Sequence, residues 1–143
     1  MAAVDMTTTI QDVIEAVNDL LIANVSGLLT AFDYPPDSLP DELVMLTYYG
    51  GGTAELQSEG MVKQLFSVTC EFHVFRKDLS RDVRLLMDNI DNIRDALTGD
   101  PTLGGKVSTY EYLEITRPLA DATYAGMQTL KMQFILRNIK INS

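Results

Sequence analysis

The sequence is poor in the residues on which catalytic and metal sites most often depend. Cys70 is the only cysteine among 143 residues, so the chain can form no internal disulfide and no thiolate metal cluster. His73 is the only histidine, and no nucleophile motif accompanies it. On one strand these two residues would point to opposite faces, so we interpret Cys70 as a core residue and His73 as a polar-face residue. We expect no enzyme, no cofactor and no metal site.

Basic residues are missing from the first 60 positions. This half contains ten acids and no Lys or Arg, whereas residues 61–143 contain all eleven bases and the other ten acids. The net charge of -9 therefore divides into -10 and +1. An acidic half repels phosphate backbones, which argues against nucleic acid as a bound ligand. It does not argue against DNA passing nearby without specific binding.

Long apolar runs are also missing. No segment approaches the roughly 18 apolar residues that a membrane span needs, and the start lacks the basic residues of a secretory signal. With 46% hydrophobic and 22% charged residues, the composition is typical of one folded domain. We expect a single soluble domain over residues 1–143 that has no membrane partner and stays where it is made.

Hydrophobic spacing predicts two helices and five strands. Apolar residues recur at helical spacing over residues 9–21 and 79–98, and Thr9 and Asp12 have the spacing of a capping box. Strands are predicted over residues 28–34, 42–49, 61–77, 106–116 and 127–141. Two helices cannot cover both faces of such a sheet. We therefore expect an α+β fold, with both helices on one face of a mixed, mainly antiparallel five-stranded sheet.

The connecting segments differ in character. We expect residues 1–8 to be flexible, the proline-rich stretch 35–40 to be a rigid connection, and the glycine-rich stretch 50–60 to be a mobile loop. A further loop is expected over residues 117–126. In the last strand the apolar alternation changes phase after Leu136, which predicts a bulge there.

Two local patterns resemble a known protein family. Residues 9–16 read TIQDVIEA and are followed by the proline-rich connection, and residues 93–97 (IRDAL) run into residues 100–107 (DPTLGGKV). Together with the order of elements, these resemble the tail terminator (tail completion) proteins of long-tailed bacteriophages. The resemblance is one of pattern over residues 9 to 141, and the passage 93–107 is its most specific part.

The resemblance implies a structural protein of the virion with no catalytic residues. Proteins of this kind form a hexameric ring on the last ring of tail-tube protein, stop the growth of the tube, and offer a surface to the head connector or neck protein. DNA would pass through the ring without specific binding. The protein would lie at the head-proximal end of the tail, and in the host cytoplasm during assembly.

Several residues are candidates for such surfaces. Exposed aromatic positions, and one arginine that falls within the apolar arc of its helix, are candidate contacts with another subunit or the tube: Tyr48, Tyr49, Arg94, Tyr110 and Tyr112. The acidic side of the first helix is a candidate channel face: Asp12, Glu15 and Asp19. The tyrosines could equally be half-buried sheet residues, and the acidic face a solvated surface.

Two other functions remain open. A head-completion or neck adaptor protein of the same particle could share the size and the ring. A small ligand-binding domain or enzyme would need a closed pocket with convergent polar groups near His73. Replacing His73 by Ala should abolish that last function, whereas a structural protein should change little.

Overall fold

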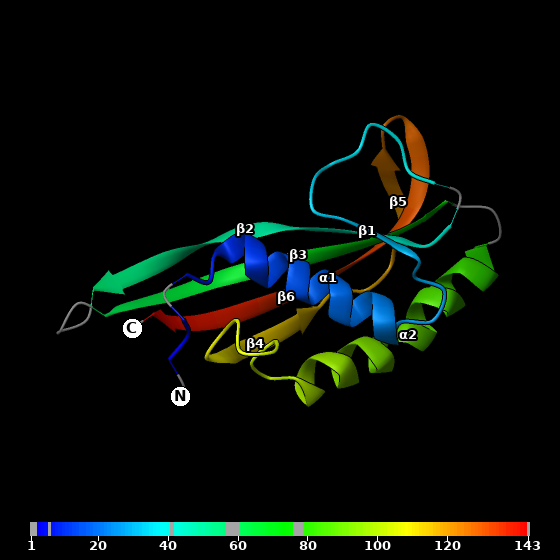
Figure 1. Cartoon of the computed structure of the whole chain (residues 1–143). Coiled ribbons are helices and arrows are strands. Elements are labelled where there is room, and N and C mark those ends of the chain that lie inside the picture. The colour runs from blue at the N-terminus through cyan, green and yellow to red at the C-terminus, as the bar shows by residue number, and fades with distance from the viewer. Residues whose placement is uncertain (1–2, 6, 41, 57–60, 76–78, 143) are drawn as a thin grey trace.

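The computed structural model describes residues 3–5, 7–40, 42–56, 61–75 and 79–142. Within these residues the chain forms two helices and one six-stranded sheet (Figure 1). In chain order the elements are α1 (Ile10–Asn24), β1 (Thr30–Phe32), β2 (Val44–Leu56), β3 (Val62–Phe75), α2 (Leu79–Gly99), β4 (Thr109–Ile115), β5 (Leu119–Tyr124) and β6 (Met127–Asn142). The expected α+β class is confirmed.

The sheet is mixed and mainly antiparallel, as expected. Its order is β1-β2-β3-β6-β4, with β1 parallel to β2 and the other neighbours antiparallel. The expected number of five strands is wrong, because residues 119–124 of the expected loop form β5 and pair with β6. This segment lacks an apolar alternation of its own. It becomes a strand because β6, at 16 residues, is long enough to pair with β4 along one part of its length and with β5 along the next.

The start of α1 confirms the predicted capping box. The backbone N–H of Asp12 donates to Thr9 Oγ1 at 3.1 Å, and the backbone N–H of Thr9 donates to Asp12 Oδ2 at 2.8 Å. The two contacts satisfy N–H groups that would otherwise lack partners at the helix start. Within the N-terminal segment that is expected to be flexible, Val4 is buried and donates its backbone N–H to the carbonyl of Ile141 at 2.7 Å.

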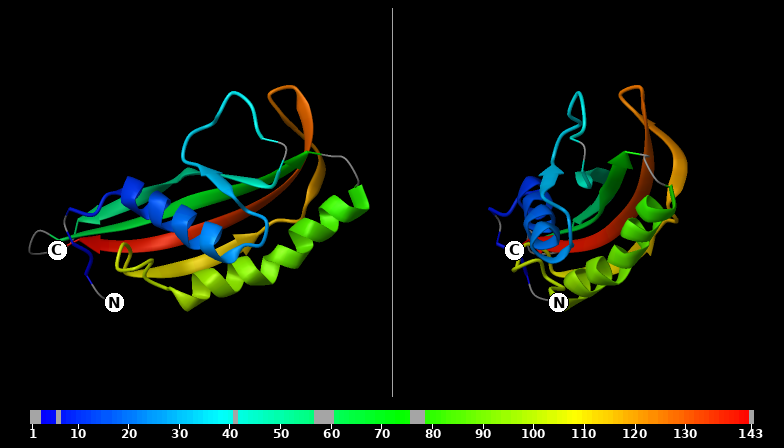
Figure 2. Two further views of the ribbon diagram at one scale, coloured as in Figure 1. Left: turned by 45° about the vertical axis from the view of Figure 1, so that its right-hand side comes forward. Right: turned by 90° about the vertical axis from the view of Figure 1, so that its right-hand side faces the viewer.

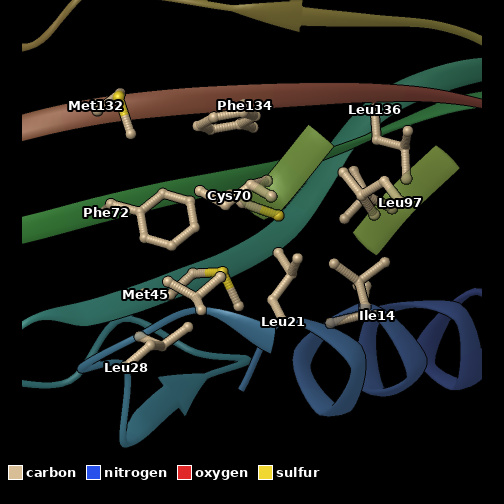
Figure 3. Packing of buried hydrophobic residues seen from close by; sticks show 14 of the residues in the cluster. Ile14, Leu21, Leu28, Met45, Cys70, Phe72, Leu97, Met132, Phe134 and Leu136 are labelled. Carbon is tan, nitrogen blue, oxygen red and sulfur yellow. The ribbon is translucent and has the colours of Figure 1, made fainter. Parts of the chain in front are cut away.

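Both helices cover one face of the sheet, which we call the helix face. Their apolar sides join a single buried cluster with alternate residues of the long strands, as Figure 3 shows for Leu21 and Ile14 opposite β2, β3 and β6. The largest fully buried members include Leu21, Leu86, Ile93, Leu97, Phe66, Phe72, Phe134 and Leu136. Burial of this apolar surface is the main source of stability.

The glycine-rich stretch is strand, not loop, over residues 50–56. This part of β2 pairs with β3 beyond a register shift between Tyr49 and Gly52. A Cβ atom on Gly52 would lie 2.3 Å from the carbonyl oxygen of Leu65, so the glycine permits a close approach of two backbones. The remainder of the expected mobile loop, residues 57–60, lies outside the described residues.

The predicted bulge in the last strand is also wrong. β6 pairs with β3 in unbroken register from Thr129 to Asn142. The phase change arises because the helix face of β6 continues with buried Asn138 and Lys140, while Ile139 and Ile141 point to the other face. The irregularities lie instead in the partner strands β2, β4 and β5.

Candidate assembly edges and a polar cluster

Each side of the sheet ends in a strand segment without a partner among the described residues. On one side, β1 pairs only with Val44–Leu46, so β2 has no outer neighbour from Thr47 to Leu56. On the other side, β4 pairs with β6 alone over Thr109–Ile115. Unpaired edges expose backbone N–H and C=O groups, which makes them templates for a strand from another chain.

The two open segments lie at the same level of the sheet. Thr109 pairs with Ile139, Ile139 with Leu65, and Leu65 with Thr53. At the other end Ile115 is linked in the same way, through Phe134 and Cys70, to Thr47. β2 and β4 therefore have unpaired backbone edges on opposite sides of the sheet, and the two unpaired edges lie at the same levels along the strands.

At the far end of this span β2 and β3 continue as a hairpin beside β6, and we call residues 52–56 and 62–66 of this hairpin the arm. The hairpin reaches past the start of α1 in two views (Figures 1 and 2). Residues 51–56 are all exposed, and the side chain of Leu56 is 88% exposed. An exposed leucine in the last pair of a long hairpin is suited to contact with another protein.

The tyrosines of β2 lie on the open edge but face opposite ways. Tyr48 points to the face opposite the helices, which we call the outer face, and donates a hydrogen bond to Glu71. Tyr49 points to the helix face and packs edge-on against Phe66, with ring centroids 6.3 Å apart. Both remain partly exposed, at 39% and 45%, so both stay candidates for an interface.

The tyrosines of β4 do not share a face as the alternation predicts. A bulge at Glu111 puts Tyr110 opposite Asn138 and Tyr112 opposite Arg137. Tyr110 therefore packs against the core, and its hydroxyl donates to the carbonyl of Asp100 at 2.5 Å. Burial raises its pKa. Tyr110 does not offer the exposed surface expected of it, whereas Tyr112 is 50% exposed on the outer face.

The charged candidates are all on the helices. Arg94 does not lie in the apolar arc of α2: it is exposed and pairs with Asp91 at 3.0 Å and Asp95 at 3.1 Å on the same helix. Glu15 and Asp19 are exposed on α1, whereas Asp12 is half-buried. The backbone hydrogen bond from Thr9 lowers the pKa of Asp12, so its first role is to cap the helix.

Glu71 and His73 form the centre of a polar cluster on the outer face. His73 is 3% exposed, its Nε2 lies 3.0 Å from Glu71 Oε1, and its Nδ1 lies 3.0 Å from Thr129 Oγ1. Tyr48 and Gln133 donate to the other oxygen of Glu71. As expected, Cys70 points to the opposite face and is buried in the core.

Glu71 stays ionised in this cluster. The hydrogen bond with His73, helped by Tyr48 and Lys131, lowers the pKa of Glu71 to about 2, although burial acts in the opposite direction. An ionised carboxylate only accepts hydrogen bonds, so His73 Nε2 carries the proton in this contact. In the neutral ring, Nδ1 then accepts from the hydroxyl of Thr129.

A pocket of about 340 Å³ opens beside the cluster. The residues that line it come from the connection after β1 and from β2, β3 and β5: Tyr34, Pro35, Leu46, Thr47, Tyr48, Glu71 and Tyr124. The β5–β6 hairpin rises beside the proline-rich connection (Figure 2), and the Tyr124 hydroxyl donates to the carbonyl of Pro36. No sequence pattern links residues 34, 71 and 124, so this pocket could not be predicted.

Two further observations concern the residue types on which metal and catalytic sites often depend. Among the described residues, no three His, Cys, Asp or Glu side chains are placed to hold a metal ion. Burial raises the pKa of the Cys70 thiol to about 12, which leaves it a poor nucleophile. No helix in the described ranges is both long and apolar enough to cross a bilayer.

No protein-family model matches the chain, and no curated protein matches it. The geometry of the edges, the arm and the polar cluster is therefore the basis for assigning a function.

Proposed function

We propose that the chain assembles into a closed ring in which β4 of one copy pairs with β2 of the next. The observation that carries this proposal is the match between the two open edges, which span Thr109–Ile115 and Thr47–Thr53 at one level of the sheet. Two different edges that meet head to tail give a ring when the rotation between copies closes.

The direction of the strands supports the same contact. The sheet has four consecutive antiparallel strands, β2, β3, β6 and β4, so β4 runs opposite to β2. A second copy in the same orientation therefore continues the sheet with an antiparallel pair, which is the more stable type. An odd number of strands would have required a parallel pair.

The ring we infer would act as a structural cap on the tail tube of a bacteriophage. It would end tube growth, form the surface that joins the head connector, and let DNA pass. This finer assignment rests on the resemblance of residues 9–16 and 93–107 to tail terminators. Because strands in a closed sheet run with a tilt along its axis, the arm would project from one rim toward the tube, with Leu56 leading.

The acidic side of α1 is our candidate for the channel wall. Glu15 and Asp19 are exposed and would repel phosphates, which lets DNA slide past without binding. This role requires that the helix face is turned toward the axis of the ring.

Disulfide cross-linking tests the ring contact. Thr53 and Thr109 are level with each other and both point to the outer face, so Thr53→Cys and Thr109→Cys should join neighbouring copies under mild oxidation. Within one copy two strands separate them, at roughly 4.8 Å per strand step, which is too far for a disulfide. Cys70 is buried and should not compete.

A pair at different levels provides the control. Thr53→Cys combined with Glu114→Cys should not cross-link, because Glu114 is level with Tyr48 instead. We expect a ladder of covalent oligomers that ends at six copies for the matched pair. If Thr53→Cys cross-links with none of the outer-face positions of β4 (Thr109, Tyr112 and Glu114), edge pairing is wrong.

A neck adaptor of the same particle remains the alternative, since it could share the ring. The two functions differ in partner, so the purified protein should be added to polymerising tail-tube protein and to filled capsids. Tubes of limited length with a ring at one end, seen by electron microscopy, support the cap. Binding to capsids alone supports the adaptor.

A further inference from the structure

The pocket on the outer face has the composition of a receptor for a cation. Three tyrosines, Tyr34, Tyr48 and Tyr124, form walls around the carboxylate of Glu71. Aromatic faces attract Lys and Arg side chains, and the ionised carboxylate adds negative charge, although Lys131 lies 4.0 Å from it. Glu71 is already hydrogen-bonded to Tyr48, His73 and Gln133. It would therefore attract a cation electrostatically, while the tyrosine rings make the direct contacts with it.

Charges around the pocket favour the same class of ligand. Burial, together with the negative charge of Asp37 and Glu71, raises the pKa of the Tyr124 hydroxyl. The connection that carries Tyr34 contains no base, whereas Lys131, which lies 4.0 Å from Glu71, is not among the lining residues. A cation entering from the open side would therefore meet aromatic and acidic groups.

The pocket lies where a neighbouring copy would arrive. β1 covers β2 only as far as Leu46, and the pocket is lined by Leu46, Thr47 and Tyr48 at the start of the open segment. If β4 of the next copy pairs there, its Ile115 lies level with Thr47. The residues that follow Ile115 then reach the mouth of the pocket.

Arg117 is the base in that position. It follows β4 by two residues, is exposed, and makes no ion pair within the described part of the chain. We propose that the guanidinium of Arg117 from one copy enters the tyrosine pocket of the next and fixes the register of the paired edges. This proposal rests on the edge pairing under the proposed function, and it names a specificity contact that the pairing alone does not require.

A double-mutant cycle on the assembled protein tests this contact. Arg117→Gln and Tyr34→Ala should each weaken self-association about tenfold in sedimentation or native mass spectrometry, and the double variant should lose little more than either one. Arg94→Gln is the matched control, because Arg94 pairs within its own helix, and it should leave association unchanged. Thermal melts of the free chain check that each variant is folded.

Methylguanidinium offers a test that needs no ring. It should shift the tyrosine ring signals of the wild type at millimolar concentration, and Tyr34→Ala should reduce the shift, whereas acetamide should have no effect. Additive effects in the cycle, or equal shifts with both compounds, overturn the proposal even if Thr53→Cys and Thr109→Cys cross-link. If those cysteines fail to cross-link but the cycle is non-additive, the edge pairing fails and the pocket contact stands.

Discussion

The two faces of the sheet differ in the interactions that their side chains make. On the helix face, alternate residues of β2, β3 and β6 are buried and apolar beneath α1 and α2. On the outer face, a small apolar cluster around Val44 and Leu46 lies at one end, next to the hydrogen-bonded group around Glu71 and His73. The helix face thus supplies the stability of the fold, while the outer face and the edges hold the groups suited to contacts with other molecules.

The largest expected effect on stability is that of an alanine substitution in the core, which we compare with the same substitution at the adjacent residue on the opposite face of β6. Phe134 is fully buried on the helix face and packs edge-on against Phe72. Phe134→Ala should lower the free energy of unfolding by about 3–5 kcal/mol, because it leaves a cavity in the core. Ile135 is half-buried on the outer face, and Ile135→Ala should cost about 1 kcal/mol. Urea titrations that give equal losses would contradict the division between the faces.

The second largest effect on stability is expected at Gly52, at the base of the arm, where the backbones of β2 and β3 approach each other closely. Gly52→Ala should lower the free energy of unfolding by about 2 kcal/mol or more, since its Cβ would also lie 2.7 Å from Phe66 Cα. Gly99→Ala is the control, because nothing lies within 4 Å of its Cβ position, and its effect should stay within about 0.5 kcal/mol. Similar melting temperatures for both variants would show that the strands separate easily at Gly52.

The smallest effect concerns the charge of Glu71, and it depends on pH. The pKa of Glu71 is about 2 in the folded chain against an ordinary 4.5, so its contribution to stability is complete above pH 4.5 and is lost as the pH falls toward 2. Glu71→Gln should therefore be less stable than the wild type at pH 7, and the difference should shrink between pH 5 and 2. Melting temperatures across this range measure it.

An exposed acid on the same face serves as the control for that series. Glu114→Gln should give a melting curve close to that of the wild type at every pH. If the gap between Glu71→Gln and the wild type stays constant from pH 7 to 2, the hydrogen bonds to Glu71 do not hold its charge in the folded state.

Local signals in the sequence predicted most of the elements. The capping box at Thr9, the apolar stripes of both helices and the alternation through Phe66 and Phe72 depend on near neighbours in the chain, so they are visible without a structure. The opposite directions of Cys70 and His73 follow from the same two-residue period.

The predictions failed where the environment of a residue depends on contacts that its spacing along the chain does not reveal. Gly52 suggests a loop by composition, but it serves the approach of β3. The bulge at Glu111 turns Tyr110 into the core, although the alternation groups it with Tyr112. Arg94 is expected within an apolar arc, but its side chain is exposed and pairs with two acids of its own helix.

By itself, the sequence determined both helices, the presence of every strand except β5, and the division between apolar and polar faces, because these follow from spacing along the chain. Only the tertiary structure decided which strands lie at the edges, that their open spans are level, and that Tyr34, Glu71 and Tyr124 meet around one pocket. These features depend on pairing between residues far apart in the chain, and hydrophobic periodicity contains no information about that pairing.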